Sequence, residues 1–404
     1  MTSFYYECTN CKAHYTTENV IYLCPQCSEK QEENEALKGV LKVVYQYETC
    51  EKDFKALQNT NFIELLPLNS YRSFPKLNIG HSPLYCLDIE HNDKKIIFYA
   101  KDDSRNPTFS YKDRASALVS AFALEHNLNT IVAASTGNAG SSIAGICAFM
   151  KQRAIVFVPE KAPLAKLTQI LMYGAQLVPV VGNYDKAVEM SRKATQKFGW
   201  YNRNTAFNPI TIEGKKTAAF EIYEQFDFQL PDRIFVPVGD GVIIAGIYKG
   251  FEDLLRLSII SKVPEIVAVQ AAGSSNLVKN LNNETPCFEN AHTVADSISV
   301  EVPAAFYLCK EFITNYKGKT VIVSDEEIIS ASAILAKTNG LFTEPASAAA
   351  FAGFLKWIDN DIESAKQKNL IMLTGSGLKD LKSVQNILNM PKAISDISEI
   401  ESVV

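Results

Sequence analysis

The sequence predicts an α/β protein that is preceded by a small metal-binding module. From about residue 95 onward, short β-branched apolar runs alternate with longer amphipathic segments, which is the pattern of parallel strands connected by crossover helices. Two Cys-x-x-Cys pairs stand within the first thirty residues. The chain has 404 residues and 47% hydrophobic content, so it can bury more than one core, because single cores stop growing at roughly 250–300 residues.

The expected strands are short, and each is followed by a polar or glycine-bearing turn. They cover residues 130–134, 154–158, 176–181, 234–238, 266–270 and 370–373. The expected helices cover residues 114–124, 141–150, 184–197, 244–255, 326–337 and 346–357. In open parallel sheets, ligands lie beyond the carboxyl ends of the strands, where helix N-termini present free N–H groups. The turns from strand to helix are therefore the candidate sites.

Two cysteine pairs, separated by twelve residues, mark the N-terminal module. They consist of Cys8 and Cys11, then Cys24 and Cys27. Nine cysteines is an odd number and the other five are isolated, which favours metal binding over disulfides. Four thiolates at this spacing can surround one zinc ion in two β-hairpin knuckles, and such a closed site is structural. Lys12 and Ser28 stand where zinc knuckles often have glycine.

The composition also predicts the domain boundaries. Residues 1–55 are rich in Cys, Tyr, Thr and Glu and have little apolar periodicity, so we expect a zinc-ribbon-like module that cannot fold on burial alone. Residues 56–404 form the expected α/β body. Within it we expect a small subdomain at roughly 110–200 and a large one made from the remainder.

Charge and hydropathy restrict the partners and the location. The net charge is −5 and the pI about 5.7, and no lysine-rich tail offers nucleic acid an electrostatic footprint. The first residues lack the charged start and apolar stretch of a signal peptide, and eighteen apolar residues never run together. We therefore expect a cytoplasmic protein that binds neither nucleic acid nor a membrane.

A lysine stands at the start of an expected helix. Residues 106–114 read Asn-Pro-Thr-Phe-Ser-Tyr-Lys-Asp-Arg, with Ser110 and Asp113 spaced like a capping pair. Lys112 then lies in the first turn, where the helix dipole disfavours a cation. Desolvation there lowers the pKa of an amine, which suits a nucleophile and a proton-transfer base. The alternative is an exposed surface lysine, as most lysines are.

Polar groups converge in the turn at residues 135–140, which reads Ser-Thr-Gly-Asn-Ala-Gly between an expected strand and helix. Ser135, Thr136 and the free backbone N–H groups can bind a carboxylate. Asn138 can hydrogen-bond an oxygen of a ring. An ordinary N-cap turn is the alternative.

Two glycine-bearing turns complete the set of candidate sites. The backbone of residues 239–243 can approach a phosphate closely at the start of a helix. The carboxylate of Asp240 would repel a phosphate unless it turned outward and left only its N–H toward the ligand. The last strand ends in Thr-Gly-Ser-Gly, where Thr374 and Ser376 offer hydroxyls or form a simple turn.

Taken in order, these four turns resemble the fold-type-II pyridoxal-phosphate enzymes. Within that superfamily the similarity to the threonine synthase family spans roughly residues 80–380. It is carried by residues 106–108, 112–114, 135–138, 374–375 and 377–380. The resemblance implies two open, mostly parallel sheets flanked by helices, with the cofactor between them.

The resemblance also implies a role for each turn. Lys112 would hold pyridoxal 5'-phosphate as a Schiff base, with the ring hydroxyl near Asn138 and the pyridine nitrogen facing Thr374. The cofactor phosphate would lie on the backbone of Gly239, Asp240, Gly241, Val242 and Ile243. The substrate carboxylate would be held by Ser135, Thr136 and Asn138. Glu344 belongs to a segment that lies near the cofactor in this superfamily, but we leave it outside the predicted site.

The implied reaction converts O-phospho-L-homoserine and water to L-threonine and phosphate, with the lysine as the base. The chain departs from the family pattern at four positions. Phe109 stands in place of a usual glycine, Tyr111 in place of a common phenylalanine, and Ser376 in place of a frequent histidine. Thr211 replaces an arginine that grips the substrate phosphate in an Asn-Pro-x-Arg-x-Glu-Gly stretch.

Positive residues elsewhere are candidates to replace the lost charge, or they are solvated surface charges. They are Arg105, Lys215 and Lys216. Thr211 favours an alternative, another pyridoxal-phosphate lyase or a β-replacement enzyme, such as cysteate synthase or threonine or serine dehydratase. A binding module without catalysis is the other alternative, and the intact Lys112 disfavours it. A small amino-acid substrate and a homodimer are the expected partners.

Overall fold

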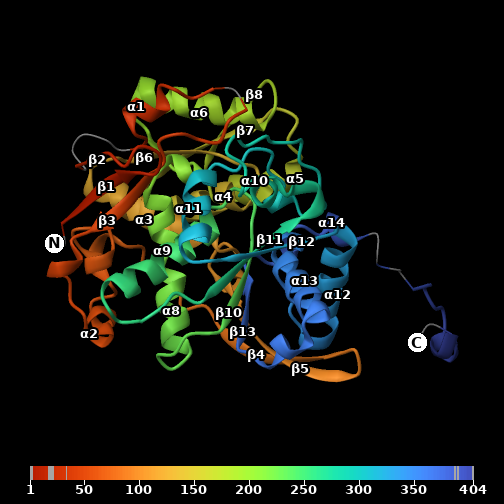
Figure 1. The fold of residues 1–404 in the computed structure, drawn as a ribbon. Helices are drawn as coiled ribbons and strands as arrows, with labels where there is room; N and C mark the ends of the chain where they lie inside the picture. The colour runs from red at the N-terminus through yellow and green to blue at the C-terminus, as the bar shows by residue number, and fades with distance from the viewer. Residues whose placement is uncertain (1–2, 17–21, 33, 386–387, 389–390, 403–404) are drawn as a thin grey trace.

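The computed structural model describes the chain except for residues 1–2, 17–21, 33, 386–387, 389–390 and 403–404. The described residues form three sheets with helices packed on their faces (Figure 1). Two sheets are mostly parallel and make up the α/β body, and the third is a small antiparallel sheet near the N-terminus. The predicted α/β class with parallel-rich sheets is confirmed.

The larger parallel sheet has six strands in the order β12-β11-β10-β13-β5-β4. Its strands are β4 (Leu84–His91), β5 (Lys94–Asp102), β10 (Arg233–Pro237), β11 (Glu265–Ala271), β12 (Lys319–Val323) and β13 (Asn369–Leu373). Every neighbouring pair is parallel except β4 and β5, which form an antiparallel hairpin at one edge. The central strand β10 is buried along its whole length, as a strand covered on both faces must be.

The smaller parallel sheet has four strands in the order β8-β7-β6-β9. Its strands are β6 (Thr130–Ala134), β7 (Arg153–Pro159), β8 (Gln176–Val180) and β9 (Tyr201–Asn202). Successive residues of β6 point to opposite faces, so Ile131 packs in one cluster and Val132 in another. Each face therefore requires its own covering helices.

The helices connect these strands and cover both faces of each sheet (Figure 1). They are α1 (Pro25–Ser28), α2 (Phe54–Asn59), α3 (Lys112–Glu125), α4 (Asn138–Met150), α5 (Leu164–Met172), α6 (Tyr184–Phe198), α7 (Ile210–Lys215), α8 (Thr217–Gln225), α9 (Val242–Arg256), α10 (Asn276–Asn280), α11 (Phe306–Asn315), α12 (Asp325–Asn339), α13 (Pro345–Asn360) and α14 (Lys382–Gln385). Among the described residues, no helix is both long and apolar enough to cross a lipid bilayer.

Different helices bury the two faces of the large sheet. On one face, α13 packs against the strands, and Phe98, Val269 and Phe351 share one buried cluster. On the other face lie α8, α9 and α11, where Phe220 and Ile234 share a second cluster. In the small sheet, α6 covers one face, and α4 packs on the other with α3 and α5 beside it. All six predicted strands and all six predicted helices are present.

Sequence reasoning missed several elements of the α/β body, which include the strands β4, β5, β9 and β12 and the helices α5, α7, α8, α10 and α11. Apolar runs do occur in the hairpin of β4 and β5, as in Ile-Ile-Phe-Tyr-Ala at residues 96–100 of β5. Charged residues interrupt β4 at Asp88 and Glu90, and β5 opens with Lys94 and Lys95. Such charges are typical of an antiparallel edge with one solvated face, unlike the fully buried strands of a parallel sheet.

The N-terminal sheet is packed against the α/β body. It consists of β1 (Phe4–Cys8), β2 (His14–Tyr15) and β3 (Leu41–Tyr45), in the order β2-β1-β3. Tyr6, Val43 and Tyr45 lie in the same buried cluster as Ile212 of α7 and Phe220 of α8. The boundary near residue 55 stays a prediction, but the two sides of it share one hydrophobic core.

A cluster of buried charged side chains, the ion cluster, lies next to the contact between the N-terminal sheet and the α/β body. Its members are Glu213, Lys216, Lys249 and Asp253. The ammonium of Lys216 is 2.5 Å from Glu213 and 2.7 Å from Asp253. The hydroxyl of Tyr45 donates to Glu213 at 2.5 Å, and that of Tyr47 donates to Asp253 at 2.7 Å. The charges balance, which makes their burial tolerable.

Replacing Lys216 by methionine should destabilise the protein strongly. The substitution leaves two buried carboxylates with one cation, and breaking a buried ion pair from one side costs about 3–5 kcal/mol. We expect the midpoint of urea unfolding to fall. The matched control is Lys193→Met, which removes an exposed partner of Glu189 and should cost about 0–1 kcal/mol. Equal midpoints for the two variants would show that the ion cluster does not stabilise the fold.

Candidate active site

The turn that carries Lys112 is tied to the turn that follows β13. The N–H of Tyr111 donates to the carbonyl of Thr374 at 2.9 Å, and the N–H of Ser376 donates to the carbonyl of Phe109 at 3.1 Å. Phe109 has a φ of +69°, a left-handed conformation that favours glycine. This conformation explains why the position is usually glycine in the family that the sequence resembles. Two of the predicted turns therefore meet in the structure.

Helix α3 begins at Lys112 without a side-chain cap. The expected capping pair is wrong. The carboxylate of Asp113 accepts hydrogen bonds from the N–H (2.7 Å) and the hydroxyl (2.5 Å) of Thr108. The buried hydroxyl of Ser110 has no hydrogen-bond partner among the described residues. Asp113 fixes the loop before the helix, and Ser110 offers a free polar group beside Lys112.

Lys112 is partly exposed and has no hydrogen bond or ion pair with any described residue. Burial lowers the pKa of its amine. Glu344 opposes this shift, Arg203 reinforces it, and Asp240 opposes it. A lowered pKa increases the fraction of neutral amine, which is the form that attacks a carbonyl carbon or takes a proton. The hypothesis of an activated lysine fits this environment better than that of a solvated surface lysine.

Asn138 is the first residue of α4, and its side-chain amide contacts Glu344, which directly precedes α13. Its Nδ2 lies 3.0 Å and 2.9 Å from the two carboxylate oxygens of Glu344 and 3.3 Å from the hydroxyl of Ser297. Asn138 and Glu344 are buried. Burial raises the pKa of Glu344, whereas Asn138, Lys112 and Lys379 lower it. Glu344 therefore lies inside the candidate site, although sequence reasoning left it out.

Ser135 and Thr136 lie in the turn between β6 and α4 and are partly exposed. The hydroxyl of Ser135 accepts a hydrogen bond from the N–H of Gly137 at 3.2 Å. The first N–H groups of a helix have no partner within that helix. The turn therefore presents hydroxyls and N–H groups of the kind that bind a carboxylate, and this role stays a prediction.

Lys379 holds the N-terminal part of α4 in place. Its ammonium donates to Ser141 at 2.7 Å, to Gln169 at 2.5 Å and to the carbonyl of Thr108 at 3.3 Å. Burial lowers the pKa of Lys379 to about 8. The ammonium thus links α4, α5 and the loop that precedes Lys112.

The loop between β10 and α9 leaves no room for side chains at its glycines. A Cβ atom at Gly239 would lie 2.8 Å from the Cα of Ile298, and Gly241 has a φ of +82°. Val242 and Ile243 begin α9, where backbone N–H groups have no partner within the helix. A phosphate can bind at such a helix start.

Asp240 is held by the loop before α11 and is only partly exposed. Its carboxylate accepts a hydrogen bond from the N–H of Ala304 at 3.3 Å. Burial raises the pKa of Asp240, and the N–H of Ala304, Lys215, Lys112 and Arg192 lower it. The side chain of Asp240 is therefore directed to the loop before α11, and three cations surround its carboxylate.

One of the three cations suggested as substitutes for the missing arginine reaches the site. Arg105 is exposed, and Lys216 belongs to the buried ion cluster. Lys215 is 2% exposed, and burial, Arg203 and Lys112 lower its pKa well below 10.5. The hydroxyl of Thr211 donates to backbone carbonyls of residues 205 and 208 and is not available as a ligand.

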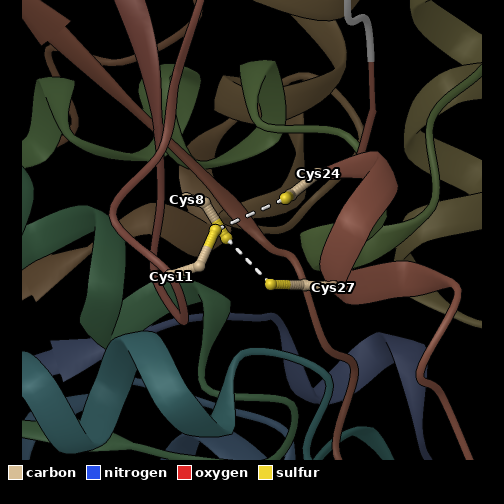
Figure 2. A group of neighbouring side chains, drawn as sticks. All are labelled: Cys8, Cys11, Cys24 and Cys27. Atoms are coloured by element: carbon tan, nitrogen blue, oxygen red, sulfur yellow. Dashed lines mark hydrogen bonds between the residues drawn. The ribbon is translucent and has the colours of Figure 1, made fainter.

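The four N-terminal cysteines lie together, and Figure 2 shows their side chains pointing toward one another. Their sulfur atoms all lie within 4.8 Å of one another. The sulfurs of Cys8 and Cys27 are 3.7 Å apart, and so are those of Cys11 and Cys24. In a tetrahedral site with Zn–S bonds of about 2.3 Å, the sulfurs are about 3.8 Å apart. The cluster therefore fits one structural zinc ion.

Only one cysteine pair lies on a β-hairpin. Cys8 and Cys11 flank the turn between β1 and β2, where Lys12 has a φ of +59°. Cys24 stands before the short helix α1, which contains Cys27 and Ser28. The prediction of two hairpin knuckles is wrong for the second pair. The left-handed backbone at Lys12 explains the usual glycine there.

Comparison with known protein families identifies the class of this site. A family model described as pyridoxal-phosphate dependent enzyme matches residues 76–375, which include all four turns. The chain belongs to this family. Its cofactor is therefore pyridoxal phosphate, and the prediction of an enzyme is confirmed.

Curated relatives of the chain are threonine synthases. The protein from Methanosarcina acetivorans is 34% identical over 97% of this chain and 96% of its own length. The protein from Methanocaldococcus jannaschii is 33% identical over 92% of both chains. That of Halalkalibacterium halodurans is 34% identical over 82% of this chain and 92% of its own. The resemblance stated from the sequence motifs is confirmed.

Solved structures share the fold at low identity. The processed form of threonine deaminase isoform 2 from Solanum lycopersicum has a TM-score of 0.65 and 21% identity, and covers 86% of this chain and 87% of its own. O-ureido-L-serine synthase has a TM-score of 0.65 and 20% identity, and covers 80% of this chain and 97% of its own. At this identity the likeness shows the fold alone.

The residues of the site fit the family's cofactor. Lys112 has a free amine with a lowered pKa, Ser110 has a buried hydroxyl without a partner, and the glycines of residues 239–241 leave the backbone accessible. The individual roles assigned to Lys112, Asn138, Thr374 and residues 239–243 stay predictions. The structure adds Glu344, Lys379 and Arg203 to the neighbourhood. The sequence signals for two of them were the glutamate directly before Pro345 at a helix start and the family motif at residues 377–380, which includes Lys379.

The cysteine cluster should hold one zinc ion per chain. Cys11→Ser removes one of the four thiolates, so we expect zinc loss and a lower thermal midpoint, because structural zinc contributes directly to folding. Metal analysis of purified protein together with thermal unfolding measures both effects. The control is Cys86→Ser, which changes an exposed cysteine outside the cluster and should keep the metal. Wild-type protein without zinc, or a Cys11→Ser variant with a full complement, would contradict the assignment.

Proposed function

We propose that this chain is a threonine synthase, which converts O-phospho-L-homoserine and water to L-threonine and phosphate. The observation that carries the proposal is the unpaired Lys112 at the start of α3, placed where the turns after β5, β10 and β13 meet the N-terminus of α4. Threonine synthases from archaea and bacteria that match most of the chain support the same reaction.

The bound cofactor supplies stabilisation of negative charge at the substrate α-carbon. Lys112 holds it covalently through Nζ, and when Nζ is released it takes the proton from the substrate Cα. Burial lowers the pKa of this amine, which increases the fraction present as the free base. Nζ would then take a proton from Cβ as phosphate leaves from Cγ, and a proton would be returned to Cγ. Water would add its oxygen at Cβ, and the proton taken from Cα would be returned to Cα.

The remaining predicted residues position the substrate and the cofactor. Ser135, Thr136 and the N–H groups at the start of α4 orient the substrate carboxylate. Asn138 donates to the ring oxygen, a role its amide performs toward Glu344 in the present structure. The backbone of residues 239–243 binds the cofactor phosphate, and the hydroxyl of Thr374 faces the pyridine nitrogen.

A β-replacement or dehydratase reaction is the second candidate function. The observation that favours it is Thr211, whose hydroxyl is bound to backbone oxygens where the related family has a phosphate-binding arginine. Both reactions need the same lysine and cofactor. They differ in whether the substrate carries a phosphate. A small amino-acid substrate fits either reaction, and the homodimer, the cytoplasmic location and the absence of nucleic-acid binding stay predictions.

Purified protein should release phosphate from O-phospho-L-homoserine at steady state and form threonine. Lys112→Ala should lower the turnover by roughly 10²–10⁴-fold or more, because it removes the proton-transferring amine. Lys193→Met, an exposed lysine of α6, is the matched control and should leave turnover unchanged. A yellow, cofactor-loaded protein that releases no phosphate would contradict the proposal and favour the second candidate function.

A further inference from the structure

Two buried cations near Lys112 have no counter-charge in contact. The Nη2 of Arg203, a residue that is 1% exposed, has no hydrogen-bond partner in the described part of the chain. The ammonium of Lys215, 2% exposed, likewise forms no hydrogen bond or ion pair there. By contrast, the equally buried Lys216 and Lys249 pair with the acids of the ion cluster. A buried cation without a counter-charge is strongly unfavourable, so these two point to a missing anion.

Both cations are fixed beside Lys112 by separate contacts. The hydroxyl of Tyr111 donates to the carbonyl of Lys215 at 2.7 Å, which ties the end of α7 to the residue before Lys112. The Nε of Arg203 lies 3.2 Å from the hydroxyl of Ser116. Ser116 stands one helical turn after Lys112, on the same face of α3. Arg203 and Lys215 thus approach the lysine from two different elements.

The electrostatic environment agrees with this placement. Burial, Arg203 and Lys112 lower the pKa of Lys215, and Asp240 opposes the shift. Once the amine of Lys112 is bound to the cofactor, its charge no longer counts among free cations. Arg203 and Lys215 then leave an excess of positive charge that Asp240 alone does not balance. An anion is the ligand that such an excess fits.

A phosphate monoester matches these groups better than a carboxylate does. A guanidinium offers parallel N–H donors to two oxygens of one phosphate, and an ammonium adds a point charge. The substrate of the proposed reaction carries such a group. So does the cofactor, but the helix start at residues 241–243 already provides a phosphate site for it. Lys215 lies one turn after Thr211 on α7, on the same side of that helix.

We propose that Arg203 and Lys215 hold the phosphate of O-phospho-L-homoserine and so determine the leaving group that the enzyme accepts. This inference rests on the proposed function. In the related family an arginine at the position of Thr211 binds the substrate phosphate. In this chain Arg203 and Lys215 take that role, and no sequence motif connects these two residues. Thr211 then serves to fix the loop at residues 205–208.

The test compares Lys215→Met and Arg203→Lys with wild type in the cofactor-loaded enzyme. We expect the KM for O-phospho-L-homoserine and the inhibition constant of orthophosphate to rise roughly tenfold or more in Lys215→Met, since a charge-assisted contact is lost. Cofactor affinity, measured by visible titration of the apoprotein, should change by less than about twofold. The control is Lys166→Met, which removes an exposed lysine.

Two outcomes would overturn the inference. Unchanged KM and phosphate inhibition in both variants would show that the cations do not contact the substrate phosphate. A loss of cofactor affinity with unchanged phosphate inhibition would assign them to the cofactor phosphate instead. Arg203→Lys keeps the positive charge but removes the parallel N–H donors of the guanidinium. It therefore distinguishes the loss of two-point phosphate binding from misfolding.

Orthophosphate binding to the cofactor-loaded protein, followed by ³¹P NMR, separates this inference from the proposed function. Binding that weakens in Lys215→Met supports the phosphate site even if O-phospho-L-homoserine is not turned over. The affinity for orthophosphate should fall as Lys215 loses its proton, at a lower pH than for an ordinary lysine, because burial lowers the pKa of Lys215. Arg203, Lys112 and Asp240 face the same group. An equal fall in Lys215→Met, or no phosphate binding by wild type, would contradict the inference.

Discussion

Arg114 binds two buried carboxylates, and this contact fixes the helix that begins with Lys112. Its Nε lies 2.6 Å from Asp103, and its Nη1 lies 2.5 Å from Glu221. Lys101 pairs with Glu221 at 2.7 Å, so the four charges balance. Asp103 follows β5 and Glu221 belongs to α8, so Arg114 joins α3 to both. Two residues earlier, Lys112 is held in a desolvated position without any such counter-charge, which is the condition for a reactive amine.

The local chemistry of the turns could be predicted from the sequence, and their partners could not. The turns at residues 106–114, 135–140 and 238–243 follow recognisable strands and open helices, so their place at the sheet edge follows from the topology of parallel sheets. Asn138 and Glu344, in contrast, are 206 residues apart, and no spacing relates them. The edge hairpin of β4 and β5 was missed because charged residues interrupt β4 and open β5, unlike the fully buried strands of a parallel sheet. Phe109 stands where the related family usually has glycine, and its left-handed backbone conformation, which explains the usual glycine, is known only from the structure.

The N-terminal cysteine module packs against helices that border the candidate site. Tyr45 and Tyr47 of its C-terminal segment hydrogen-bond Glu213 in α7 and Asp253 in α9. The helix α7 ends at Lys215, and α9 begins at the glycine loop. Only short segments therefore separate the metal-binding sheet from the groups around Lys112. The metal-binding sheet thus contacts two helices that border the candidate site.

The identity of the lysine that carries the cofactor is the point on which all these roles depend. Lys112 and Lys215 both have lowered pKa values, and both lie near the glycine loop, so chemistry must distinguish them. Borohydride reduction of the yellow protein, followed by peptide mass spectrometry, labels the lysine that holds pyridoxal phosphate. We expect the label on the peptide that contains Lys112, at one per chain, and none on Lys215. A label on Lys215 would contradict the assignment and exchange the roles of the two residues.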